Sequence, residues 1–180
     1  MNKIIAIVGM CGSGKTVATE LFEKAGYQKV YFGKVTFDEM EKRGLEINEA
    51  NERLIREEFR STGDKAIYAR LNLPKIEELH KTSNVVVESM YSWSEYKLLK
   101  EHFGETFEVL AIVTNCGKRR ERLLTRKIRP MTIEQSLSRD YSEIENIEKA
   151  GPIGIADYYI TNNGSEEEFE KKILDFIKNY

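Results

Sequence analysis

The sequence predicts a three-layer α/β/α sandwich, in which helices cover both faces of a five-stranded parallel sheet. Short apolar runs of strand length alternate along the 180 residues with longer segments of helical periodicity. Strands that alternate with helices join through right-handed crossovers into a parallel sheet. A glycine-rich turn from Gly9 to Thr16 also connects the first strand to the first helix. No internal repeat or linker interrupts the pattern, so we expect one domain over residues 1–180.

The composition is that of an ordinary soluble globular protein. Hydrophobic residues make up 41% and charged residues 32%, with a net charge of -2, so the chain lacks the basic field of a protein that coats nucleic acid. No apolar run approaches the ~20 residues that span a bilayer. The first residues lead straight into a strand, so we expect neither a signal nor a transit peptide. Two cysteines make no disulfide framework and favour a cytoplasmic location.

The first strand, loop and helix follow one another directly. Lys3 to Val8 (KIIAIV) is apolar and β-branched, as is typical of a buried parallel strand. After the loop, apolar residues recur at helical spacing until Gly26 ends the helix. Gln28 to Phe32 predicts a second strand.

From Thr36 to His80 the chain is mostly helical in character. We expect breaks at residues 44–46, at residues 62–63 and near Pro74. We interpret the acidic run within this segment as a solvated helical face rather than as an acidic binding site.

Three more strands are predicted by apolar, β-branched or aromatic runs: Asn84–Glu88, Phe107–Thr114 and Tyr158–Thr161. Three helices should open on capping boxes: Ser92 with Glu95, Thr132 with Gln135, and Ser165 with Glu168. A basic helix begins at Gly117. We expect the helix after Thr132 to face the core through Ile133, Leu137, Ile144 and Ile147.

The turn GMCGSGKT satisfies the phosphate-binding pattern G-x-x-x-x-G-K-[ST]. Its glycines let the backbone close around phosphate oxygens, and the loop amides and helix N-terminus present donors to an anion. Lys15 reaches the β- and γ-phosphates, and the Thr16 hydroxyl holds Mg²⁺. We therefore predict ATP contacts from Gly9, Cys11, Gly12, Ser13, Gly14, Lys15, Thr16 and Val17.

The class of P-loop protein follows partly by elimination. A GTPase would carry N-K-x-D after a late strand, and the nearest stretch, residues 115–118, lacks the acid. Motor and AAA-type ATPases are much longer chains. The compact kinases remain.

An acid and a group of arginines support this interpretation. Glu88 ends a buried strand, where it would join Thr16 at Mg²⁺; the alternative is a polar strand end that meets solvent. The segment from Lys118 to Arg129 contains seven basic residues and only one acidic residue. Fixed guanidinium groups stabilise a transferring phosphoryl group. We expect residues 122–139 to form a short lid; a solvated basic helix and an RNA-binding patch are the alternatives.

On these features the chain resembles the nucleoside monophosphate kinase superfamily, and most closely an uncharacterised adenylate-kinase-related branch and dephospho-CoA kinases. Four blocks carry the resemblance: the P-loop, Gly63-Asp64 with Ala69-Arg70-Leu71, Arg122 and Arg126 with Arg139-Asp140, and Ala156 to Gly164.

The resemblance implies a role for residues outside the P-loop. Arg122 would stack on the ATP base, with Asn162 and Asn163 beside it, while Arg126 and Arg139 would act with Lys15 on the transferring phosphate. The acceptor lobe would be the helical insertion at about 36–80. Its acceptor contacts would include Arg70 and Arg60.

Two departures concern the acceptor. The loop after the second strand has Lys34 near its start and Asp38 at its end. A dephospho-CoA kinase would have an aspartate directly after this strand. Tyr91 also stands where the monophosphate kinases usually have an arginine that clamps the acceptor phosphate. We expect Lys34, Asp38 and Tyr91 to contact the acceptor together with Arg60 and Arg70.

We predict an ATP- and Mg²⁺-dependent kinase for a small nucleotide-like acceptor. Dephospho-CoA kinase-like activity, or a nucleotide sensor with weak ATPase activity, is the alternative. Membranes and nucleic acids are not expected as partners.

Overall fold

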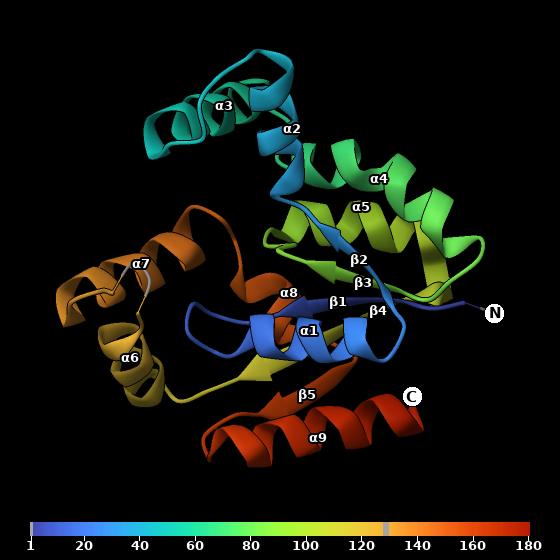
Figure 1. Cartoon of the computed structure of the whole chain (residues 1–180), viewed down its shortest axis with the longest axis vertical. Coiled ribbons are helices and arrows are strands. Elements are labelled where there is room, and N and C mark those ends of the chain that lie inside the picture. The colour runs from blue at the N-terminus through green and yellow to red at the C-terminus, as the bar shows by residue number, and fades with distance from the viewer. Residues whose placement is uncertain (1, 128–129) are drawn as a thin grey trace.

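The computed structural model describes residues 2–127 and 130–180 and confirms the three-layer sandwich (Figure 1). All strand pairs are parallel, in the order β2-β3-β1-β4-β5. The strands are β1 Ile4–Val8, β2 Gln28–Tyr31, β3 Val85–Glu88, β4 Phe107–Val113 and β5 Tyr158–Thr161.

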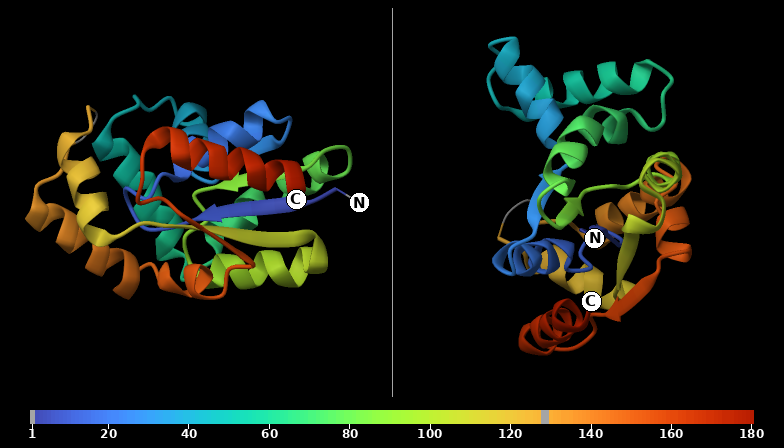
Figure 2. Two further views of the ribbon diagram at one scale, coloured as in Figure 1. Left: turned by 90° about the horizontal axis from the view of Figure 1, so that it is seen from below. Right: turned by 90° about the vertical axis from the view of Figure 1, so that its right-hand side faces the viewer.

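Two separate apolar cores hold the helices against the two faces of the sheet. The two views of Figure 2 show helices on both sides of the strands. Helices α1 (Lys15–Lys24) and α9 (Glu166–Asn179) cover one face, where Phe22 and Ile173 are fully buried. The other face carries α4 (Ile67–His80), α5 (Trp93–Phe103) and α8 (Ala150–Gly154), with a short 3₁₀ turn at Gly104–Thr106 after α5. The central strands β1, β3 and β4 are thus largely buried between the two helical layers, and the carboxyl ends of the strands are where a ligand site is expected.

Four helices extend away from the sandwich in two pairs (Figure 1). Helices α2 (Lys34–Lys42) and α3 (Glu49–Ser61) stand beyond the end of β2, and α6 (Cys116–Thr125) and α7 (Ile133–Glu145) stand beyond the end of β4. Residues 128 and 129, which belong to the lid predicted at residues 122–139, lie outside the described residues.

All three predicted capping boxes are present. Ser92, Thr132 and Ser165 each accept a hydrogen bond from the backbone amide three residues later, and the Glu or Gln at that position closes the box. Helices α5, α7 and α9 therefore begin where the sequence predicts.

The expected break near Pro74 is wrong, because α4 continues through it. Ala69 and Ile76 are buried on either side of the proline, and the Asn72 side-chain amide donates to the carbonyls of Phe32 (3.2 Å) and Tyr68 (2.8 Å). Tertiary contacts on both sides hold the helix together despite the missing amide hydrogen bond.

The expected inward face of α7 is also wrong. Ile133 and Ile144 are 55% and 47% exposed, and Leu137 and Ile147 are only half-buried. The buried positions of the helix are instead Ser136, Asp140 and Glu143. Polar partners on neighbouring segments determine this orientation, and they belong to the site described below.

Within the described part of the chain, no helix has the length and apolar character needed to cross a bilayer.

Candidate functional site

The phosphate loop has the backbone of an anion cradle. Gly9, Gly12 and Gly14 have φ angles of 149°, 79° and 102°, which residues with side chains rarely adopt. A Cβ atom on Gly14 would lie 2.4 Å from the Asn162 side-chain nitrogen, and one on Gly9 would lie 2.5 Å from the Ile112 carbonyl oxygen. At these two positions only glycine fits, and a glycine-rich turn before a helix suits a phosphate group.

Lys15, the first residue of α1, folds back into this loop. Its ammonium donates to the Met10 carbonyl oxygen at 3.0 Å. Burial, and then the positive charge of Lys149, lowers the pKa of Lys15 to about 7. An anion bound in the loop would relieve both effects.

Glu88 lies beside the loop because β3 is the direct neighbour of β1 and pairs Glu88 with Ile7. Burial raises the pKa of the Glu88 carboxyl group, and its nearest cation is Lys29 at 3.9 Å. Thr16 is exposed at the start of α1. One carboxylate, one hydroxyl and the phosphates of a nucleotide are a donor set that suits Mg²⁺. No group of three or more His, Cys, Asp or Glu residues in the described ranges forms a metal site of its own.

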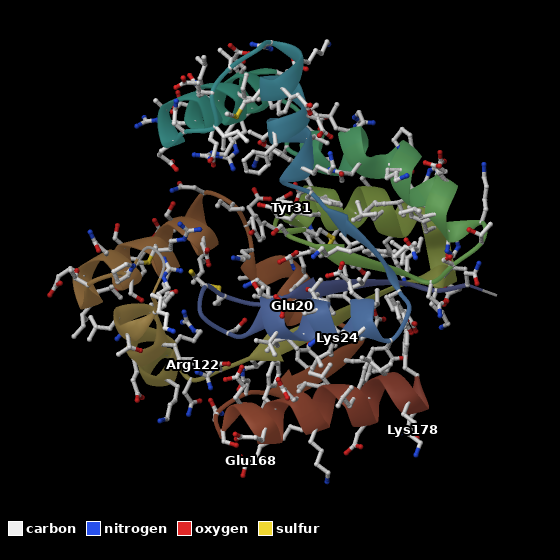
Figure 3. All side chains as sticks on the ribbon, in the orientation of Figure 1. Glu20, Lys24, Tyr31, Arg122, Glu168 and Lys178 are labelled. Atoms are coloured by element: carbon white, nitrogen blue, oxygen red, sulfur yellow. The ribbon has the colours of Figure 1, made fainter. Side chains whose placement is uncertain are left out.

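The structure brings together Arg122 and Asn162, which the resemblance places at the nucleotide base. The Arg122 guanidinium donates to Asn162 Oδ1 at 3.1 Å, and Asn162 Nδ2 donates to the Ser13 carbonyl at 2.9 Å (Figure 3 labels Arg122). Asn163 Oδ1 accepts from the Asn115 amide at 2.8 Å. One guanidinium nitrogen of Arg122 and the Ser13 hydroxyl are buried without a partner in the described chain. Unpartnered groups at this position are consistent with a site for a polar ligand.

Helix α6 is fixed to α7 and to the loop by Arg119. Its guanidinium makes two hydrogen bonds to the Asp140 carboxylate, at 2.7 and 2.9 Å, and one to the Cys11 carbonyl at 3.1 Å. The pair is almost fully buried. Arg126 follows the end of this helix and is half-buried.

Glu143 and Lys149 are central residues that the sequence analysis missed. The Glu143 carboxylate accepts from the Cys11 amide (3.1 Å), the Lys149 ammonium (3.0 Å) and Arg139 Nε (3.2 Å). Although burial opposes it, the charge of Lys149 and these hydrogen bonds lower the pKa of Glu143. The spacing of Ser136, Asp140 and Glu143 at i, i+4 and i+7 was the available signal, since it defines a polar face on α7.

A cleft of about 1240 Å³ lies between the α2–α3 pair and α7. Two of the predicted acceptor residues, Arg60 and Tyr91, line it, as does Arg139. The Tyr91 hydroxyl donates to Ser89 Oγ at 2.9 Å, and burial raises its pKa to about 12, so the phenol is neutral.

The other three predicted acceptor residues are not among those that line the cleft. Lys34 and Asp38 pair with each other on the exposed surface of α2, and Arg70 pairs with Asp64 at 2.7 Å.

The wall that α3 gives to this cleft carries two arginines, Arg56 and Arg60. Arg56 is held by Glu49 at 2.7 Å and Glu52 at 3.0 Å, and most of the predicted acidic run is paired in this way within the lobe. The Arg60 guanidinium forms no salt bridge with a described residue, and its charge acts on the buried carboxyl group of Glu95, which also lines the cleft. Aromatic side chains also reach the cleft, among them Tyr31, which Figure 3 labels at the end of β2. An anionic ligand that carries a ring fits these surroundings.

Comparison with known proteins supports the same fold. A family model described as an AAA domain matches residues 5–149. A UPF0200 protein of Thermococcus kodakarensis is 35% identical over 97% of this chain and 97% of its own length, and one of Methanosarcina mazei is 30% identical over 100% and 96%. An AAA-domain model thus matches a chain of 180 residues, so the exclusion of AAA-type proteins by their length is wrong.

The solved structures that resemble the chain include several kinases. TT1252 from Thermus thermophilus has a TM-score of 0.65 at 20% identity and covers 99% of this chain and 97% of its own. A dephospho-CoA kinase from Campylobacter jejuni (99% and 97% coverage) and a shikimate kinase from Bacteroides thetaiotaomicron (98% and 97%) each have a TM-score of 0.62 at 14% identity. The chain therefore has a P-loop kinase-like fold.

Proposed function

The chain belongs to the UPF0200 proteins and, through residues 5–149, to the AAA-domain family. From this membership and the geometry of the site, we propose that it is an ATP- and Mg²⁺-dependent kinase that phosphorylates a small nucleotide-like acceptor. One observation carries the proposal. A single cleft is lined both by Arg139 and Glu143, which lie against the phosphate loop, and by Arg60, whose guanidinium forms no salt bridge with a described residue. Donor phosphate and acceptor anion would thus have sites at the two ends of one space.

The donor nucleotide would be held by the loop. Its amides and Lys15 would bind the β- and γ-phosphates, and Arg122, Asn162 and Asn163 would lie beside the base. Thr16 and Glu88 would hold Mg²⁺, which neutralises charge on the phosphates when it is bound.

Transfer would depend on position and charge. Arg139 lines the cleft next to the loop, and we assign it together with Arg126 to the transferring group. Guanidinium groups that are already oriented stabilise the spread charge of the transition state without reorganisation. Closure of residues 122–139 would exclude the water that otherwise hydrolyses ATP.

The acceptor would lie between α3 and α7. Arg60 would bind its anionic group, and Tyr91, a neutral phenol at the floor of the cleft, would bind it through contact and hydrogen bonding rather than charge. Roles for Lys34, Asp38 and Arg70 stay predictions, because these side chains lie away from the cleft lining.

The test is ADP release from ATP and Mg²⁺ against a panel of acceptors, with Lys15→Ala as the control. The panel should contain nucleoside monophosphates and dephospho-CoA, and also shikimate and gluconate, since kinases of those names share the fold. Strong stimulation by one nucleotide-like compound, lost in Lys15→Ala, is the expected result. Tight ATP binding with no response to any acceptor would reject the kinase and favour a nucleotide sensor.

A further inference from the structure

Three hydrogen-bond donors from three different segments converge on one buried carboxylate. They are the Cys11 amide of the phosphate loop, the Lys149 ammonium before α8 and the Arg139 guanidinium of α7, and all meet Glu143. The side chains of Glu143 and Lys149 are only 3% and 4% exposed. An amide and two cations arranged around one small space make an anion site, which here holds an anion of the chain itself.

This anion site adjoins both the phosphate loop and the acceptor cleft. Glu143 is joined to the loop through the Cys11 amide, and Glu143 and Arg139 also line the cleft. Lys149 is close enough to Lys15 for its positive charge to contribute to the lowered pKa of Lys15. A group passing from a nucleotide in the loop to an acceptor in the cleft would cross this position.

The cations of the site would be exposed if Glu143 left it. Lys149 contacts the Glu143 carboxylate on one side and the Tyr91 ring on another, with its ammonium 4.3 Å from the ring centroid. Removal of the carboxylate alone would open Lys149 toward the loop and leave its charge unpaired. A phosphoryl group resembles a carboxylate in presenting oxygens to several donors at once, and it carries more charge.

We propose that Lys149, Arg139 and the Cys11 amide bind the transferring phosphoryl group of the nucleotide, and that Glu143 fills their site until the nucleotide arrives. The inference rests on the proposed function for the identity of the ligand. It adds Lys149 as a residue that contacts the γ-phosphate and gives Glu143 the role of its competitor.

The test compares β,γ-imido-ATP, which is not hydrolysed, with ADP, because only the former has a γ-phosphate. Dissociation constants would be measured by calorimetry with Mg²⁺ for the wild type, Glu143→Gln and the double variant Glu143→Gln with Lys149→Met. Glu145→Gln, an exposed acid on the same helix, and Lys178→Met on α9 are the matched controls (Figure 3 labels Lys178).

Glu143→Gln should tighten binding of the triphosphate by roughly tenfold, about the effect of one hydrogen bond to a charged group, and leave ADP unchanged. The double variant should lose that gain again, since Lys149 then no longer contacts the phosphate. A double variant that binds the triphosphate as tightly as Glu143→Gln would show that Lys149 serves only as the counter-ion of Glu143, and it would overturn the inference. An equal gain for both nucleotides would do the same.

A second measurement leaves Glu143 in place. In wild-type protein with ¹³C-labelled lysine, the Lys149 side-chain signal, assigned from Lys149→Arg, should shift with β,γ-imido-ATP and stay unchanged with ADP. No shift would contradict the proposed contact. If wild-type protein binds neither nucleotide, the proposed function fails and this inference with it; if it binds both and the variants behave as the counter-ion model requires, only the inference fails.

Discussion

Raising the pH from 7 to 9 should weaken the binding of ATP, because Lys15 loses its proton in the empty protein. Burial next to Lys149 lowers the pKa of Lys15 to about 7. A triphosphate held against the ammonium favours the charged form and restores the pKa toward its ordinary range. Above pH 7, ATP therefore binds only as the lysine takes up a proton.

The magnitude follows from linkage with a single proton. If only protonated Lys15 binds ATP, the apparent dissociation constant scales as one plus the ratio of neutral to charged lysine. With a pKa of about 7 this factor is about 2 at pH 7 and about 100 at pH 9, so the affinity should fall roughly 50-fold.

The same lysine should make the folded protein more stable as the pH rises, which is opposite in direction to its effect on ATP affinity. Between pH 7 and its ordinary pKa of 10.5, the unfolded chain holds a proton on Lys15 that the folded chain has released. The contribution of Lys15 to the free energy of unfolding therefore rises with pH across this window.

The assay is competition against a fluorescent nucleotide from pH 6 to pH 9.5 at saturating Mg²⁺. Lys15→Arg is the control, because a guanidinium stays charged throughout and should give a flat profile. Calorimetry in buffers of different ionisation enthalpy would count the protons taken up at pH 8. A wild-type affinity that stays constant from pH 7 to pH 9, with no proton uptake, would refute the reasoning.

Three further predictions concern the loop, its support and the cleft. Gly14→Ala should abolish nucleotide binding and destabilise the fold beyond the roughly 1–2 kcal/mol that a positive φ angle costs a side chain. Gly26→Ala, with a φ of 96° and open space around it, should show only the backbone effect in thermal unfolding; equal losses in the two variants would contradict the packing argument. Arg119→Met leaves the buried carboxylate of Asp140 on α7 without its cation. The free energy of unfolding, measured in urea, should fall by about 3–5 kcal/mol. A loss under about 1 kcal/mol would mean that the pair contributes no more than an exposed one. Arg60→Ala should raise the KM of the acceptor at least roughly tenfold and leave the KM of ATP unchanged. Arg53→Ala, on the same helix but paired away from the cleft, should change neither constant. Similar kinetics in the two variants would show that Arg60 does not bind the acceptor.

Most of the fold could be predicted because each element carries its own local signal. The strands are short runs of β-branched residues, and the helices α5, α7 and α9 begin at side chains that cap them. The signal of the phosphate loop is equally local, since its glycines and Lys15 all lie within residues 9–15. These signals do not depend on where distant segments lie.

The failures arise where distant segments decide the outcome. Pro74 weakens a helix locally, yet buried residues on both sides of it keep α4 continuous. Helix α7 was given an apolar inward face because hydrophobic periodicity is the usual indicator. Its true partners, Arg119 and Lys149, lie on either side of it in the sequence, and their pairing with acids of α7 becomes visible only in three dimensions.

The reversed face of α7 has a thermodynamic consequence for any movement of this helix. A helix that packs through leucines and isoleucines exposes them when it lifts, and the heat capacity rises as water covers the apolar surface. Ile133 and Ile144 already face solvent, so α7 could separate from the loop with little change in heat capacity. The contacts that hold α7 are instead the buried ion pairs of Arg119 with Asp140 and of Lys149 with Glu143, and their separation exposes polar surface, which lowers the heat capacity. Movement of α7 should therefore be marked by a small or negative change in heat capacity.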